Sequence, residues 1–241
     1  MRPSDLAIFG RSLVHRLGKR FPWVAAIPGS NGRRILDIGS GHRPHRDATH
    51  LLELYLSDDT ERGKGLKVLG KLLIQGNVEA LPFKDKSFDY AYACHVLEHV
   101  TDPDRACSEL MRVARAGYIE TPDPFYEQGY NYPDLERRGW PFHRWFVWVN
   151  ETGTLIFEPK NEETLQKFCG CRYANFVRKI YQFVESERRD KDQGLNRLHR
   201  ALPKECNYTQ VHWVDRFCFE VHRSAPAAEE VQRRPDPVIA G

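Results

Sequence analysis

The sequence lacks long apolar runs, a strong excess of one charge and a dense set of cysteines. No stretch reaches the roughly 18 consecutive apolar residues of a membrane-spanning helix, and no apolar run with a cleavage site begins the chain. A cytoplasmic protein without a membrane partner is therefore expected. The 36 Lys and Arg against 33 Asp and Glu leave a net charge of +3, which argues against a nucleic-acid partner. Six scattered cysteines fit reduced thiols better than a disulfide framework.

Hydrophobic residues make up 41% of the 241 residues, which is enough for one sizeable core. From Arg33 onward, short apolar runs alternate with helical stretches, which predicts an α/β doubly wound fold with a mostly parallel sheet. The expected helices are Pro44–Leu52, with proline at its first position, and Pro103–Ala114. Three glycines between Asp59 and Lys71 favour a loop there. The expected strands cover residues 35–38, 52–56, 72–75, 88–93 and 118–121.

The segments before and after the predicted strands differ from them in composition. Residues 1–30 carry apolar side chains at helical spacing, which predicts a helical cap packed on a domain of residues 31–223. Residues 144–158 predict an added hairpin, and residues 211–222 a closing antiparallel strand. Residues 224–241, rich in Ala, Pro and charge, predict a disordered tail.

The run Ile35-Leu-Asp-Ile-Gly-Ser-Gly41 is a strand that leads into a glycine turn. Such a turn lets a ligand approach the backbone closely. A dinucleotide fingerprint has a third glycine at position 44, where this chain has proline, so a pyrophosphate site is disfavoured. The acidic pair Asp58-Asp59 follows the next expected strand, at about the distance where a carboxylate meets ribose hydroxyls in such folds.

Five motifs follow one another in order along residues 33–124. They are Leu36-Asp-Ile-Gly-Ser-Gly41, Asp58-Asp59, Gly76-Asn-Val-Glu-Ala-Leu-Pro-Phe83, Ser87-Phe-Asp-Tyr-Ala-Tyr-Ala-Cys-His-Val-Leu-Glu-His-Val100 and Glu109-Leu-Met-Arg-Val-Ala-Arg115. This series resembles the class I S-adenosylmethionine-dependent methyltransferases, closest to their small-molecule branch with a methyltransferase type 11-like domain. The resemblance implies a seven-stranded Rossmann-like sheet, a cofactor-binding half at 33–124 and an acceptor-side half at 125–223. It also implies S-adenosyl-L-methionine as cofactor and S-adenosyl-L-homocysteine as product.

Carried over position by position, the resemblance implies a set of cofactor-binding residues. Asp37, Gly39 and Gly41 would shape the pocket for the methionine half, and Asp59, or Asp58 in a register shifted by one, would accept from the ribose hydroxyls. The remaining members are Asn77 and the backbone of Val78 at the adenine, and Cys94 and His95 beneath the sulfonium.

Two residues depart from the pattern of that family. Arg43 replaces a usual third glycine, and Asn77 replaces a frequent aspartate. Arg43 can pair with the methionine carboxylate, and Asn77 keeps a carbonyl that accepts from the adenine amino group. The departures also support an alternative hypothesis, in which the chain is a catalytically silent scaffold of the same fold.

Methyl transfer is an in-line displacement, so the protein must align acceptor, methyl and sulfur in a dry site. An oxygen acceptor with a high pKa also needs a base, and His143 and His99 are the candidates. Structural hydrogen bonding is the alternative for His143, and ordinary core packing for most tryptophans. The expected acceptor contacts are Asp123, Tyr126, Trp140 and Trp145.

The acceptor is predicted to be a small molecule, such as a secondary metabolite or a saccharide, methylated at oxygen or nitrogen. After the fourth expected strand the chain has Ala93-Cys-His-Val-Leu-Glu98 rather than the Asn or Asp followed by Pro-Pro of enzymes that methylate bases. No metal site is predicted. Cys169-Gly-Cys171 is too closely spaced for a typical zinc pair, and the histidines at 42, 45 and 50 do not share one helical face.

Overall fold

The computed structural model describes residues 27, 31–58, 64–124, 127, 142–161, 163–164 and 208–223. The predicted cap at 1–30, apart from Ile27, and the predicted tail at 224–241 lie outside this part of the chain. Within it, the elements are β1 (Ile35–Ile38), β2 (His50–Glu53), β3 (Leu72–Gln75), β4 (Tyr90–Cys94), α2 (Pro103–Val113), β5 (Ala116–Pro122), β6 (Trp145–Val149), β7 (Leu155–Pro159), β8 (Tyr208–Val214) and β9 (Phe219–Val221).

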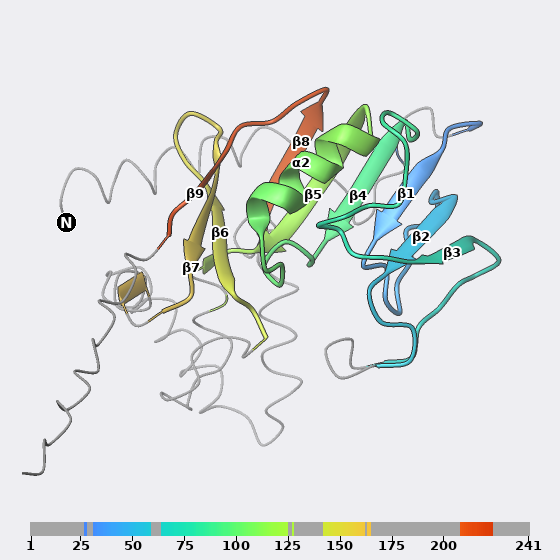
Figure 1. Cartoon of the computed structure of the whole chain (residues 1–241), viewed down its shortest axis with the longest axis horizontal. Helices are drawn as coiled ribbons and strands as arrows, with labels where there is room; N and C mark the ends of the chain where they lie inside the picture. Colours follow the sequence, from blue (N-terminus) through green and yellow to red (C-terminus); the bar gives the residue numbers. More distant parts are fainter. Residues whose placement is uncertain are drawn as a thin grey trace, which may run out of the picture.

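The larger sheet has the strand order β3-β2-β1-β4-β5-β8 (Figure 1). Strands β1 to β5 run parallel, and β8 is antiparallel to β5. The doubly wound, mostly parallel fold and its antiparallel strand near the C-terminus are thus confirmed. The sheet has six strands among the described residues, whereas the family pattern implied seven.

The apolar runs of β1 and β2 form strands that are buried on both faces of the sheet, as is usual for parallel strands. Leu36 and Ile38 of β1 pack into the main core, while Ile35 packs with Leu51 and Ile27 in a second cluster. Helix α2 contributes Leu110 to the main core and lies over β4 and β5 in the view of Figure 1. It begins as predicted, with Pro103 in its first turn and the Asp102 side chain accepting from the Arg105 amide.

The predicted helix Pro44–Leu52 is wrong. Residues 44–49 form turns, and β2 begins at His50, two residues before the strand expected at 52–56. The physical reason is tertiary: Asp37 Oδ2 accepts from the His45 amide at 2.6 Å, and the Thr49 amide donates to Ile35 O at 2.9 Å. These bonds draw residues 39–49 back onto β1, so a regular helix has no room between the two strands.

Strands β6, β7 and β9 build a second, smaller sheet in the order β6-β7-β9. The predicted hairpin is confirmed, since β6 and β7 pair antiparallel around a turn at 150–154 in which Asn150 Oδ1 accepts from two backbone amides. The single closing strand predicted at 211–222 is in fact two strands. β8 ends before Asp215, which has a φ of 59°, and β9 then pairs parallel with β7 in the smaller sheet.

None of the helical segments in the described part of the chain has the length and apolar character needed to span a bilayer.

Candidate functional site

The glycine turn follows β1 at the carboxyl end of the parallel strands. Gly39 and Gly41 have φ values of 64° and 54°, a left-handed conformation that favours glycine. Glu53, the last residue of β2, accepts from Ser40 Oγ at 2.7 Å and from the Gly41 amide at 2.6 Å through one oxygen, Oε1. Asp37 holds the loop that follows the turn, because its carboxylate accepts a hydrogen bond from the His45 amide. Two buried carboxylates, from adjacent strands, therefore fix the shape of the turn.

The carboxylate at the end of β2 is Glu53, which the sequence analysis missed. In the sequence the strand is expected two residues later, at 52–56, and this position favours Asp58 and Asp59. Asp58 is exposed and lies five residues beyond the strand, and Asp59 lies outside the described residues. The signal for Glu53 was the polar residue that closes the run Leu51-Leu52-Glu53, once the strand is taken to start at His50.

The predicted adenine and carboxylate contacts lie around the same edge of the sheet. Asn77 follows β3, and its Oδ1 accepts from the Glu79 amide at 2.9 Å, so an adenine amino group must use the second lone pair. Val78 is buried beside it. Arg43 is exposed in the turn after Gly41.

The pKa of Asp37 is raised from 3.8 to about 7, mainly by burial and in smaller part by the nearby Glu53, while the hydrogen bond from the His45 amide acts in the opposite direction. The folded state therefore binds this proton more tightly than the unfolded state. The stability that the group contributes is present below pH 3.8 and is lost as the pH rises through about 7.

In cofactor-free protein, we expect Asp37 to lower the free energy of unfolding by up to about 1.4 kcal/mol per pH unit across that window. Asp37→Asn removes the titration but keeps an oxygen that accepts from His45, so its stability should lack this slope. Urea unfolding at several pH values checks the difference. Parallel pH profiles for the two proteins would show that Asp37 is ionised in the folded state.

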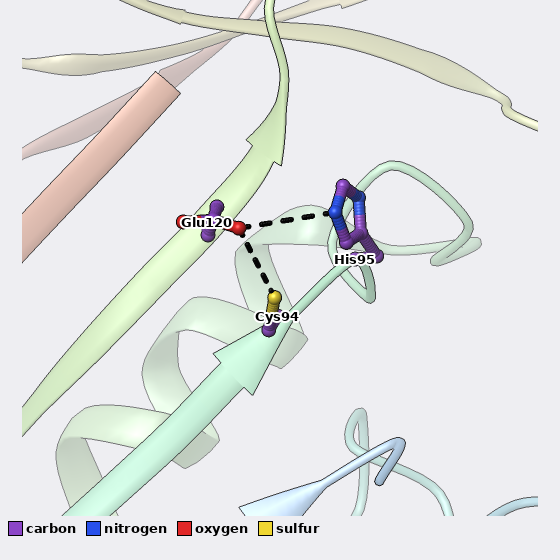
Figure 2. Close-up of side chains that lie close together, drawn as sticks. All are labelled: Cys94, His95 and Glu120. Carbon is purple, nitrogen blue, oxygen red and sulfur yellow. Dashed lines mark hydrogen bonds and ion pairs between the residues drawn. The ribbon is translucent and has the colours of Figure 1, made fainter. Parts of the chain in front are cut away.

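Cys94 ends β4 and His95 follows it, and both face Glu120 of β5 (Figure 2). Cys94 Sγ donates to Glu120 Oε1 at 3.3 Å, and His95 Nε2 lies 3.9 Å from the same oxygen. The other oxygen of Glu120 accepts from the Tyr118 hydroxyl and from Gln210 Nε2. Burial and the nearby Glu120 raise the pKa of the Cys94 thiol well above its usual value, so Cys94 is a poor nucleophile.

A second cluster brings together the two histidines that the sequence analysis singled out. The rings of His99 and His143 meet edge to face with centroids 4.6 Å apart, although one follows β4 and the other precedes β6. The amides of Arg144 and Trp145 both donate to Glu98 O, at 2.7 and 3.2 Å, and so hold the start of β6 against the loop after β4.

Buried charged residues surround these histidines. Glu98 Oε1 lies 3.3 Å from His95 Nδ1 and 4.0 Å from His99 Nε2. Glu127 Oε2 lies 3.1 Å from His143 Nδ1, while its Oε1 accepts from Lys160. From the sequence, Glu127 is expected only to follow the fifth strand and face the cleft. No role is expected there for Glu98, Glu120 or Lys160, because only the fold brings their segments together.

The predicted acceptor contacts are only partly described. Asp123 follows β5 and is half-buried, and its carbonyl accepts from the Glu127 amide. Trp145 Nε1 donates to Val100 O at 2.8 Å, and its ring packs on Phe157, which fits the structural alternative. Tyr126 and Trp140 lie outside the described residues.

Comparisons with known proteins find methyltransferases among the matches to this chain. Residues 46–119 match the family model of the methyltransferase domain. The ubiquinone/menaquinone biosynthesis C-methyltransferase UbiE of Xylella fastidiosa (strain M12) is 29% identical over 205 residues, which cover 72% of this chain and 79% of the relative. The protein of that name from Stenotrophomonas maltophilia (strain K279a) is 34% identical over 129 residues, which cover 47% of this chain and 49% of the relative.

The matched segment thus spans about half the length of this second relative and of several others. A solved S-adenosylmethionine-dependent methyltransferase from Mesorhizobium loti is 20% identical, with a TM-score of 0.33, over 56% of this chain and 60% of that one. The match over residues 46–119, the relatives and the parallel sheet with a glycine turn after β1 support a class I S-adenosylmethionine-dependent methyltransferase.

Proposed function

We propose that the protein transfers a methyl group from S-adenosylmethionine to an oxygen or nitrogen atom of a small molecule. The glycine turn held by Asp37 and Glu53 is the observation that carries the proposal. It lies between β2 and β4, where the strand order reverses and α/β sheets bind ligands at the carboxyl ends of their strands.

On the cofactor side, the proposed contacts follow the edge of the sheet. Gly39, Gly41 and Arg43 would hold the methionine half, Asn77 and Val78 the adenine, and Cys94 and His95 would lie beneath the sulfonium. For the ribose hydroxyls we propose Glu53 ahead of Asp58 and Asp59, because Glu53 is the carboxylate that ends β2 beside the turn.

On the acceptor side, we propose that His99 and His143 contact the acceptor. Imidazoles and carboxylates offer both donors and acceptors of hydrogen bonds, which suits a hydroxyl or an amine. The UbiE relatives are named as C-methyltransferases, so a carbon acceptor is the alternative. Mass spectrometry and NMR of a methylated product would distinguish the methylated atom.

Calorimetric titration with S-adenosylhomocysteine tests the cofactor site. The wild-type chain should bind, and Glu53→Ala should weaken binding about tenfold or more, because it leaves Ser40 Oγ and the Gly41 amide without their acceptor. The matched control is Asp58→Ala, an exposed carboxylate whose loss should leave the affinity unchanged.

Each other result has a defined meaning. No binding at millimolar ligand would reject the methyltransferase proposal. A weaker Asp58→Ala beside an unchanged Glu53→Ala would return the ribose contact to Asp58. Binding without transfer to a panel of phenols, sugars, amines and quinols would favour the silent scaffold.

A further inference from the structure

We propose that Glu98, His99 and His143 form a binding site for one divalent first-row transition metal ion. Their ligand atoms, one from each residue, all lie within 4.8 Å of one another. Two imidazole nitrogens and one carboxylate oxygen make a donor set that Zn²⁺ and Fe²⁺ take in proteins, with further positions left open. The site does not depend on the methyltransfer proposed above.

The carboxylate of Glu98 has an oxygen available for an ion. Glu98 is 1% exposed, and its Oε1 faces His95 and His99. Its Oε2 is buried and accepts no hydrogen bond from any described residue. Because a buried carboxylate needs a cation or hydrogen bonds to be tolerated, this oxygen is a natural metal ligand.

His143 has the outer partner that metal-binding histidines usually have. Glu127 Oε2 lies 3.1 Å from its Nδ1, so a proton on Nδ1 is favoured electrostatically and the lone pair of Nε2 is left for an ion. Lys160 pairs with the other oxygen of Glu127, so that carboxylate serves as a support and not as a fourth ligand. All three side chains are more than nine-tenths buried, which fixes the orientation of the imidazole.

The neighbouring group Cys94, His95 and Glu120 also has three ligand atoms close together (Figure 2). It is the weaker candidate, because both oxygens of Glu120 already accept hydrogen bonds, from Cys94 on one side and from Tyr118 and Gln210 on the other. An ion there would have to displace those donors. At Glu98, an ion bound to the buried Oε2 would displace no hydrogen-bond donor of a described residue.

If the proposed function holds, His99 and His143 would contact the acceptor through the ion, whose open positions would take an acceptor oxygen. A bound cation polarises that oxygen and helps it to lose a proton. The class of acceptor that this favours is a hydroxyl compound with a second oxygen able to reach the same ion.

The test is metal binding to the full-length protein after removal of metals by a chelator. Zn²⁺ is titrated in competition with a chromophoric chelator, and Co²⁺ is followed by its visible absorption. We expect one equivalent of Zn²⁺ per chain, lost in Glu98→Gln, His99→Gln and His143→Gln. Glu127→Gln, which removes only the outer partner, should weaken binding by about 10- to 100-fold. Excess Mg²⁺ should not compete, since it prefers an all-oxygen site.

Two controls make the result specific. His222→Gln removes a half-exposed histidine that lies 3.4 Å from Glu158, and Cys94→Ala removes a ligand atom of the neighbouring group. Both should bind Zn²⁺ like the wild type. Circular dichroism and S-adenosylhomocysteine binding of each metal-free variant establish that it is folded, and they report on the cofactor site separately from the metal.

Three outcomes would overturn the proposal. The first is no Zn²⁺ or Co²⁺ binding by the wild type, which would mean that protonated histidines balance Glu98. The second is loss of binding in Cys94→Ala with retention in His143→Gln, which would place the ion at Glu120. The third is unchanged binding in all three ligand variants.

Discussion

Gly117→Ala is expected to lower the free energy of unfolding by about 3 kcal/mol, at the upper end of the usual cost of overpacking. Gly117 lies inside β5, where it pairs with Ala91 of β4 and Trp213 of β8. A Cβ at this position would lie 2.5 Å from Ala91 O and 2.6 Å from two ring atoms of Trp213. Because Ala91 O belongs to the backbone and Trp213 is 4% exposed, the sheet itself must shift to accept the methyl group.

Urea and thermal unfolding measure the effect, and for a chain of this size it corresponds to a fall in Tm of roughly 10 °C. Gly153→Ala is the control. Gly153 has a φ of 84° in the hairpin turn, and a Cβ there meets no atom within 4 Å, so it should cost only about 1 kcal/mol of backbone strain. If both variants lose the same stability, the tight contact between β5 and its neighbours is not a constraint on the fold.

The parts of the fold that sequence predicts well have local signals. Helix α2 has a capping aspartate, a proline in its first turn and an apolar stripe, and all three act within the helix. The hairpin of β6 and β7 depends on a turn whose hydrogen bonds come from Asn150 itself. Strand β1 is recognisable because an apolar run next to a glycine turn suits a strand buried on both faces.

The errors arise where distant residues decide the local structure. Pro44 is a good first residue of a helix, but Asp37 and Ile35 hold residues 45 and 49 in turns. Because the predicted helix extended to Leu52, the next strand was expected two residues too late, and Glu53 was not recognised as its last residue. The acid–base chemistry of histidine was the signal that predicted His99 and His143 as candidate bases. Their partners Glu127 and Lys160 come from separate segments that only tertiary packing joins, so no spacing rule reveals them.

Gly39→Ala is expected to weaken the binding of S-adenosylhomocysteine about tenfold or more. A residue with a side chain at a φ of 64° costs roughly 1–2 kcal/mol, and a Cβ there would lie 2.6 Å from Val96 Cγ2. The free protein relieves this strain by relaxing the turn. Only molecules whose turn keeps the wild-type conformation can bind the ligand. The apparent affinity is therefore reduced in proportion to the fraction of molecules in that conformation.

Val96 allows the two causes to be separated, because the clash involves its side chain whereas the φ strain does not. Val96→Ala alone should bind nearly as the wild type does, and Gly39→Ala/Val96→Ala should recover only part of the lost affinity. Full recovery would show that space, and not the left-handed backbone, limits the turn. Wild-type affinity in Gly39→Ala itself would mean that the turn after β1 does not contact the cofactor, since a binding loop cannot be distorted without a change in its ligand's affinity.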